Sequence, residues 1–133
     1  TLEEKCNSYL TCPSGGPLVQ HAVVAMFEAH HQGKISVEKI VEKMCHNPAK
    51  IFKIEKRGFI KEGYFADIAI VNAYLPWNVK KENILYKCGW SPFEGYNFKS
   101  RVTHTFVNGK LVYANGKVKE TKAGQRLLFD RTL

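Results

Sequence analysis

The chain has 133 residues, of which 44% are hydrophobic and 12% aromatic, a composition that can form a packed core and excludes a disordered chain. It contains no run of 18 or more apolar residues, so we expect no membrane-spanning helix. The formal net charge is +8, but the Lys and Arg residues are dispersed and no nucleic-acid-binding motif occurs, so we expect no nucleic-acid partner.

The first part of the chain is predicted to be a loop followed by helices. Residues 1–16 are rich in turn-forming residues and favour a loop. Apolar residues at three- and four-residue spacing predict a helix over Leu18–Gln32, and a second apolar stripe predicts one over Val37–His46. The dipeptide Asn47-Pro48 is expected to break the second helix before a short helical turn that ends near Phe52.

After residue 52 the pattern changes to strands. Residues 66–71 are β-branched and mostly apolar, which predicts a buried strand. Residues 72–100 read as a long irregular stretch, and such stretches are usually functional or pack against another part of the protein. Asn108-Gly109 predicts a β-hairpin turn, and Asn115-Gly116 a second turn before the final strand.

The titratable residues form no complete catalytic constellation. The four cysteines lack a Cys-x-x-Cys pair, which argues against a zinc finger and indicates reduced thiols in the cytoplasm. The adjacent pair His30-His31 ends the first predicted helix, where neighbouring residues face different directions and the helix dipole explains two cations better than a metal does. We therefore predict neither a catalytic residue nor a metal ligand in this chain.

The loop Pro13-Ser14-Gly15-Gly16 is the one candidate binding element. Its glycines allow a ligand to approach the backbone closely, and exposed N–H and C=O groups can pair with a cyclic amide or imide. It is expected to precede a helix N-terminus, where anions are favoured. A plain turn at the entry to a helix explains the same residues equally well.

Several segments of the chain match a known pattern: Thr1–Lys5, Asn47–Phe52, Arg57–Gly63, Ala66–Val71, Lys87–Gly95 and Thr105–Tyr113. Together they resemble the C-terminal part of cyclic amidohydrolases. The run Ser-Pro-Phe-Glu-Gly at 91–95 is more similar to dihydroorotases than to allantoinases. Cys12–Gly16 occupies the place of the substrate-contacting loop of that family.

The resemblance implies an α+β fragment that begins just after the Asp-His-Ala-Pro-His motif of dihydroorotases. Residues 1–52 would supply the last loop and helices of a metal-dependent hydrolase TIM barrel. Residues 53–133 would supply the C-terminal strands of a composite β-sandwich domain, with residues 72–100 as its long loop.

The resemblance also implies a zinc-dependent hydrolase that interconverts dihydroorotate and N-carbamoyl-L-aspartate in pyrimidine synthesis. The ligands of the binuclear zinc centre of that family all lie upstream of the matched segments, so this chain alone is expected to bind no metal and to be inactive. Its contribution to substrate binding would come from Pro13, Ser14, Gly15 and Gly16. Two alternatives stay open: an allantoinase or hydantoinase, and an inactive dihydroorotase-like assembly partner.

The expected partners are the small-molecule substrate and further copies of the protein. The predicted helices 18–32 and 37–46 carry apolar stripes that would normally face a barrel. In an isolated chain these stripes would be exposed, so we expect a homo-oligomer or self-association through them.

Overall fold

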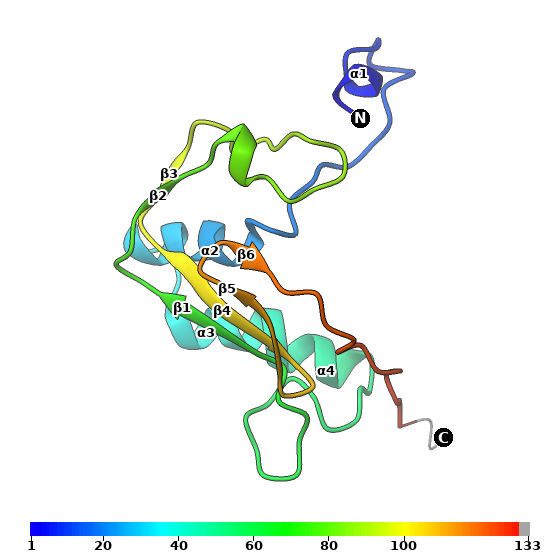
Figure 1. Cartoon of the computed structure of the whole chain (residues 1–133), viewed down its shortest axis with the longest axis vertical. Coiled ribbons are helices and arrows are strands. Elements are labelled where there is room, and N and C mark those ends of the chain that lie inside the picture. Colours follow the sequence, from blue (N-terminus) through cyan, green and yellow to red (C-terminus); the bar gives the residue numbers. More distant parts are fainter. Residues whose placement is uncertain (131–133) are drawn as a thin grey trace.

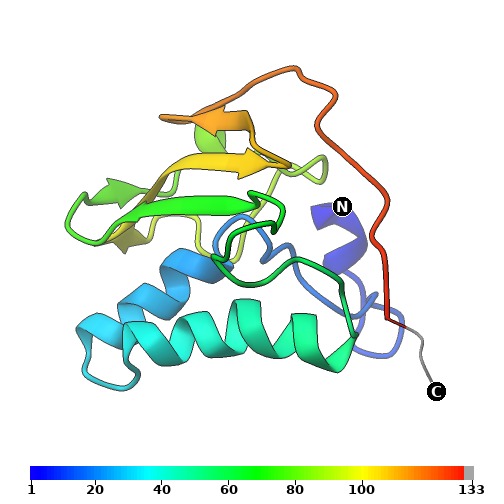
Figure 2. The same cartoon turned by 90° about the horizontal axis from the view of Figure 1, so that it is seen from below.

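The computed structural model describes residues 1–130, which form a helical layer and a β layer. Figure 2 shows the blue-to-teal helices lying below the green-to-orange strands. Within the described residues, the α-helices and the π-helix all lie before residue 52: α1 (Leu2–Lys5), α2 (Ala22–His31), α3 (Val37–Val41), the π-helix η1 (Glu42–His46) and α4 (Asn47–Ile51). Helices before strands, with an antiparallel sheet, confirm the predicted α+β class.

The strands form two antiparallel sheets. The larger sheet has the order β1-β4-β5-β6, and the smaller one pairs β2 with β3 (Figure 1). Their bounds are β1 (Ile68–Asn72), β2 (Trp77–Asn78), β3 (Asn97–Phe98), β4 (Arg101–Val107), β5 (Lys110–Ala114) and β6 (Lys117–Val118). A short 3-10 helix, η2 (Lys81–Asn83), lies between β2 and β3.

Both predicted Asn-Gly turns are present. Asn108 and Gly109 have φ angles of 50° and 76°, and Val107 pairs with Lys110 across the turn. Asn115 and Gly116 have φ angles of 48° and 90° and connect β5 to β6. Positive φ at both central positions matches the twist of the flanking strands, which is why this dipeptide predicts the hairpins correctly.

The helices differ from the prediction in their boundaries. The predicted loop contains α1, and α2 begins at Ala22 rather than Leu18. Gln20 explains the later start, because its backbone N–H donates to Tyr86 Oη (2.8 Å) and its side chain bonds Asn83 and Leu85. These contacts with the long segment hold residues 18–21 in a turn.

The expected break at Asn47-Pro48 is wrong. The helix continues from α3 through η1 into α4, and Pro48 lies in the first turn of α4. Proline has no N–H to donate, so it fits where one helical register ends and the next begins. The wider turn of the π-helix provides that change of register.

The core lies between α2 and the segment 72–100. Val24 of α2 packs with Val79 and Phe98, and all three are buried. Trp77 and Phe93, from the same long segment, pack against them. The stretch predicted as irregular therefore supplies most of the core, and it supports the neighbouring N-terminal residues.

Strand β1 is less buried than predicted. Ala69 and Ile70 are both exposed although consecutive strand residues point to opposite faces of the sheet, so neither face of β1 is fully covered there. The sequence of β1 is that of a strand covered on both faces. At the other end of the chain, the tail returns to the turn after α4, where the backbone N–H of Glu55 donates to Leu128 O (2.9 Å).

Candidate functional site

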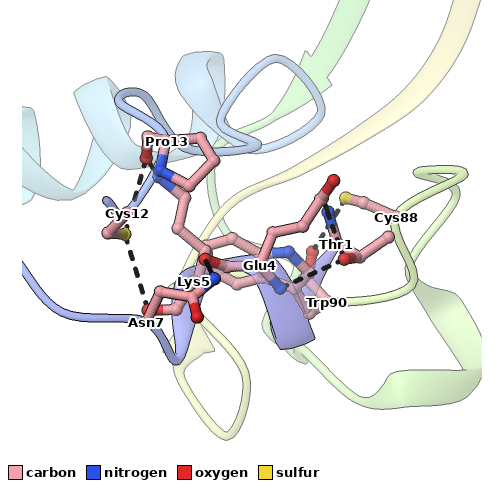
Figure 3. Close-up of polar contacts among 8 residues, drawn as sticks. All are labelled: Thr1, Glu4, Lys5, Asn7, Cys12, Pro13, Cys88 and Trp90. Carbon is pink, nitrogen blue, oxygen red and sulfur yellow. Dashed lines mark hydrogen bonds and ion pairs between the residues drawn. The ribbon is translucent and has the colours of Figure 1, made fainter.

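The predicted loop lines a pocket of about 410 Å3 at the N-terminal end of the molecule. Three parts of the chain build it: α1, the loop, and the tip of the long segment. The lining residues are Thr1, Glu4, Lys5, Pro13, Ser14, Gly15, Gly16, Pro17, Cys88 and Trp90. Figure 3 shows Cys88 and Trp90 on one side of α1 and Pro13 on the other.

The four predicted residues lie together on the pocket wall, and all four are exposed. Gly15 has a φ of 82°, a left-handed conformation that favours glycine. Within residues 1–130, the hydroxyl of Ser14 and the peptide groups of Gly15 and Gly16 make no hydrogen bond to protein. The loop thus has donors and acceptors free for a ligand.

The loop is not at a helix N-terminus. Residues 17–21 separate Gly16 from α2, and the backbone N–H of His21 donates to Leu18 O (3.0 Å) in a turn. The expected help from a helix dipole is therefore absent at this loop. The polar groups around the loop are therefore its own peptide groups and those of neighbouring side chains.

Two neighbouring side chains hold the loop. The ammonium of Lys5 donates to the carbonyl oxygen of Pro13, as Figure 3 shows. The thiol of Cys12 lies 3.5 Å from Lys5 O and 3.6 Å from Pro13 O. Lys5 is thus both a wall of the pocket and a support of the loop.

Cys88 and Trp90 belong to the pocket but were not predicted as site residues. They are half-buried, and the Cys88 thiol lies 3.8 Å from Trp90 O. They lie more than 70 residues from the loop in sequence, so no local pattern links them to it. The available signals were the length of the irregular stretch and the family resemblance of Lys87–Gly95, which contains both residues.

A second, larger groove of about 680 Å3 runs between α2, the long segment and the open face of the sheet. Its floor is formed by Ala69, Thr105, Tyr113 and Val118, which face one another across the four strands. Its other wall includes Val19 and Val23 of the α2 region, together with Leu85 and Tyr86. The groove is mainly apolar and holds no carboxylate.

The histidines do not converge on a metal site. His30 contacts Ile35 O, His31 contacts Ser100 Oγ (2.9 Å), and His46 stacks on Phe59. Burial lowers the pKa of His21, which is enclosed by aromatic rings. Among the described residues no group of three or more His, Cys, Asp or Glu is arranged to hold a metal ion, so these residues do not fit a metal centre by themselves.

Residues 7–112 match the amidohydrolase family, and this range includes the loop, Cys88 and Trp90. The chain belongs to the amidohydrolase family. Family membership confirms the predicted superfamily, and it explains why the loop, the long segment and the hairpin occur in one polypeptide.

Among curated relatives, the chain is 36% identical over 115 residues to the dihydroorotase of Pyrococcus furiosus, covering 86% of this chain and 28% of that protein. It is 46% identical over 81 residues to the dihydroorotase of Endomicrobium trichonymphae, covering 61% and 19%. The solved L-hydantoinase from Arthrobacter aurescens superposes with a TM-score of 0.75 at 27% identity, covering 84% and 25%. The chain spans less than a third of these relatives.

Within residues 1–130 no helix is both long enough and apolar enough to cross a membrane.

Proposed function

We propose that this chain is the C-terminal part of a dihydroorotase, an enzyme that interconverts dihydroorotate and N-carbamoyl-L-aspartate in pyrimidine synthesis. The observation that carries the proposal is its 36% identity over 115 residues to a protein with that name. Residues 1–52 would form the last loop and helices of the barrel, and residues 53–133 the C-terminal strands of the β-sandwich domain. The reduced state of all four cysteines is consistent with a cytoplasmic location.

In the whole enzyme the loop Pro13–Gly16 contacts the substrate ring. A cyclic amide presents a carbonyl oxygen and an N–H group side by side, and the unpaired peptide groups of Gly15 and Gly16 can pair with both. The hydroxyl of Ser14 adds one rotatable donor. The half-buried indole of Trp90 closes the other side of the pocket.

A binuclear zinc centre in the whole enzyme would need its ligands from other parts of the polypeptide. Such a centre supplies a hydroxide nucleophile and polarises the carbonyl group that is attacked. The role of the present residues is to bind and orient the ring. We infer that residues 1–133 alone do not hydrolyse a cyclic amide.

The proposed activity is tested by loading the whole polypeptide with zinc and comparing its turnover of dihydroorotate, allantoin and hydantoin. We expect dihydroorotate to be hydrolysed with the highest kcat/KM. A hydantoinase is the second candidate, because two solved hydantoinases that are 27% and 25% identical superpose with TM-scores of 0.75 and 0.74. Intact metal loading without dihydroorotate hydrolysis would overturn the proposal. Turnover of hydantoin or allantoin would then favour the second candidate, and turnover of none of the three an inactive assembly partner.

The substrate contact of the loop is tested by Gly16→Ala in the whole enzyme. A Cβ at Gly16 meets no atom within 4 Å, and its φ lies outside the left-handed region, so the folded loop accepts alanine. A ring held against the backbone would collide with the methyl group. We expect KM to rise by about tenfold or more, which corresponds to at least 1.4 kcal/mol of lost binding.

The matched control for this variant is Gly124→Ala, because Gly124 has the same open surroundings and lies outside the pocket. Its KM should equal that of the unmodified enzyme. An unchanged KM in Gly16→Ala would show that the loop does not touch the substrate.

A further inference from the structure

Lys5 has a fixed backbone at the end of α1. Thr1 and Glu4 form a capping box at the start of this helix, with Glu4 N donating to Thr1 Oγ1 (3.3 Å). At the other end, Asn7 Nδ2 donates to Glu4 O (3.0 Å) and Cys6 N donates to Leu2 O (3.2 Å). The side chain of Lys5 therefore extends from a defined point towards the loop.

Lys5 and the loop hold each other through bonds in both directions. The ammonium of Lys5 donates to Pro13 O, and the thiol of Cys12, directly before Pro13, points back to Lys5 O at 3.5 Å. Between them, the backbone N–H groups of Thr11 and Cys12 both donate to Ser8 O, at 3.0 and 2.8 Å. A solvated surface lysine would not be expected both to donate to the loop and to accept from it.

We propose that Lys5 is the positioning residue of the ring-contacting loop. Gly15 and Gly16 have no hydrogen bond of their own within the described chain, and two adjacent glycines have many accessible conformations. A charge-assisted hydrogen bond to Pro13 O anchors the loop directly before this flexible pair. The loop is thereby ordered before the ligand arrives, which reduces the entropy lost on binding.

This role concerns binding rather than the chemical step. A preorganised loop lowers KM, whereas loss of its anchor weakens substrate binding and leaves the reacting groups unchanged. The identity of the ligand that the loop binds rests on the proposed function. The anchor itself can be tested without any substrate, through the thiol of Cys12.

The first experiment measures alkylation of Cys12 by N-ethylmaleimide in the 133-residue chain, quantified by mass spectrometry of the peptide that contains it. Loss of the anchor frees the half-buried thiol. We expect Lys5→Met to raise the alkylation rate of Cys12 about threefold or more. A threefold rise corresponds to a decrease of about 0.7 kcal/mol in the free energy of local opening. The rate of Cys45, which lies in η1, serves as an internal reference.

The second experiment measures steady-state kinetics of the whole, zinc-loaded enzyme on dihydroorotate. We expect Lys5→Met to raise KM about tenfold with kcat within about twofold of the unmodified value. Lys5→Arg keeps a cationic donor and should restore KM to within about threefold. Lys39→Met is the matched control, because Lys39 pairs with Glu42 on the exposed face of α3.

The outcomes separate the two proposals. Unchanged Cys12 reactivity in Lys5→Met overturns the anchor, whatever the enzyme does. Faster Cys12 alkylation with an unchanged KM overturns the positioning role, as does an equal loss in Lys5→Arg. An unmodified enzyme that hydrolyses no cyclic amide refutes the proposed function, and the alkylation rates then still decide whether Lys5 anchors the loop.

Discussion

His21 is fully buried inside a cage of aromatic side chains. Its ring lies nearly parallel to those of Trp77 and Phe98, at centroid distances of 5.8 and 6.1 Å, and Tyr86 and Phe93 approach it edge-on. The role of this histidine in the structure is packing, because its ring is enclosed and its side chain makes no capping hydrogen bond to α2. No local pattern, however, indicates that four rings from the segment 72–100 surround it.

The polar contacts of His21 are confined to one ring nitrogen. Tyr86 Oη and Ser91 Oγ lie 3.4 and 3.1 Å from His21 Nδ1. Both hydroxyls also accept a backbone N–H, from Gln20 (2.8 Å) and Phe93 (3.2 Å) respectively. The other ring nitrogen, Nε2, is buried without a hydrogen-bond partner in the described chain.

This environment predicts acid sensitivity. Burial lowers the pKa of His21 in the folded chain, whereas in the unfolded chain it titrates near its ordinary pKa of about 6.5. Stability is therefore retained above pH 6.5 and is lost as the pH falls below that value, because the unfolded state takes up the proton first. The free energy of unfolding, measured in urea between pH 7.5 and 5, should show this loss, with a limit of about 1.4 kcal/mol per pH unit for one proton.

Two further measurements isolate the contribution of His21. His21→Gln should remove most of this pH dependence, whereas His104→Gln on β4 should keep it. If His21→Gln does not fold, the pKa of His21 can be measured instead from the NMR resonances of its ring in the unmodified chain. Titration of that ring at pH 6.5 or above contradicts the prediction.

At the scale of elements, the turn after α4 is fitted closely against the helices. A Cβ at Gly58 would lie 2.5 Å from Ala49 Cβ and 2.7 Å from Cys45 O. Next to Gly58, the guanidinium of Arg57 pairs with Asp67 and donates to Asn108 Oδ1 (2.7 Å). This turn thus connects the helical layer to β1 and to the β4–β5 hairpin.

Gly58 and Gly63 form a matched pair for testing this close fit. Both have a φ of 78°, but a Cβ at Gly63 meets nothing within 4 Å. We expect Gly63→Ala to cost about 1 kcal/mol through its left-handed backbone alone. Gly58→Ala should cost about 3 kcal/mol or more, because the clash with α4 and η1 is added.

Urea unfolding of the two variants measures both costs on the same scale. Equal destabilisation would mean that the turn does not pack against α4 and η1 as described.

At the scale of the whole molecule, the chain exposes more surface than a compact protein of its size. Its accessible area is 9853 Å2, whereas a monomer of 15.2 kDa exposes about 7,100 Å2. The excess of about 2,700 Å2 exceeds what one partner contributes to a standard protein interface. The exposed β1 strand and the apolar groove lie on this surface.

We expect the isolated chain to self-associate through the groove. Val19 and Val118 line it and are 89% and 64% exposed, and burying such residues against a second copy is favourable. Light scattering should give a mass above that of the monomer, which rises with concentration. Val118→Lys should lower that mass by placing a charge on the groove wall.

The control for this prediction is Ile60→Lys, because Ile60 is 93% exposed and lies outside the groove. It should associate as the unmodified chain does. A strictly monomeric chain at high concentration would contradict the prediction.

The sequence by itself determined the features that depend on neighbouring residues. The two Asn-Gly turns, the α+β order and the turn-rich loop at Pro13–Gly16 all follow from local backbone preferences. The apolar run of β1 was correctly read as a strand, although its burial was not, since burial depends on what covers the sheet.

Only the tertiary structure decided which distant residues meet. It delayed the start of α2 by bonding Gln20 to the long segment, and it placed Cys88 and Trp90 beside the loop. It also revealed Lys5 as the support of Pro13. Contacts between residues far apart in sequence depend on how the whole chain packs, and a local pattern carries no information about that packing.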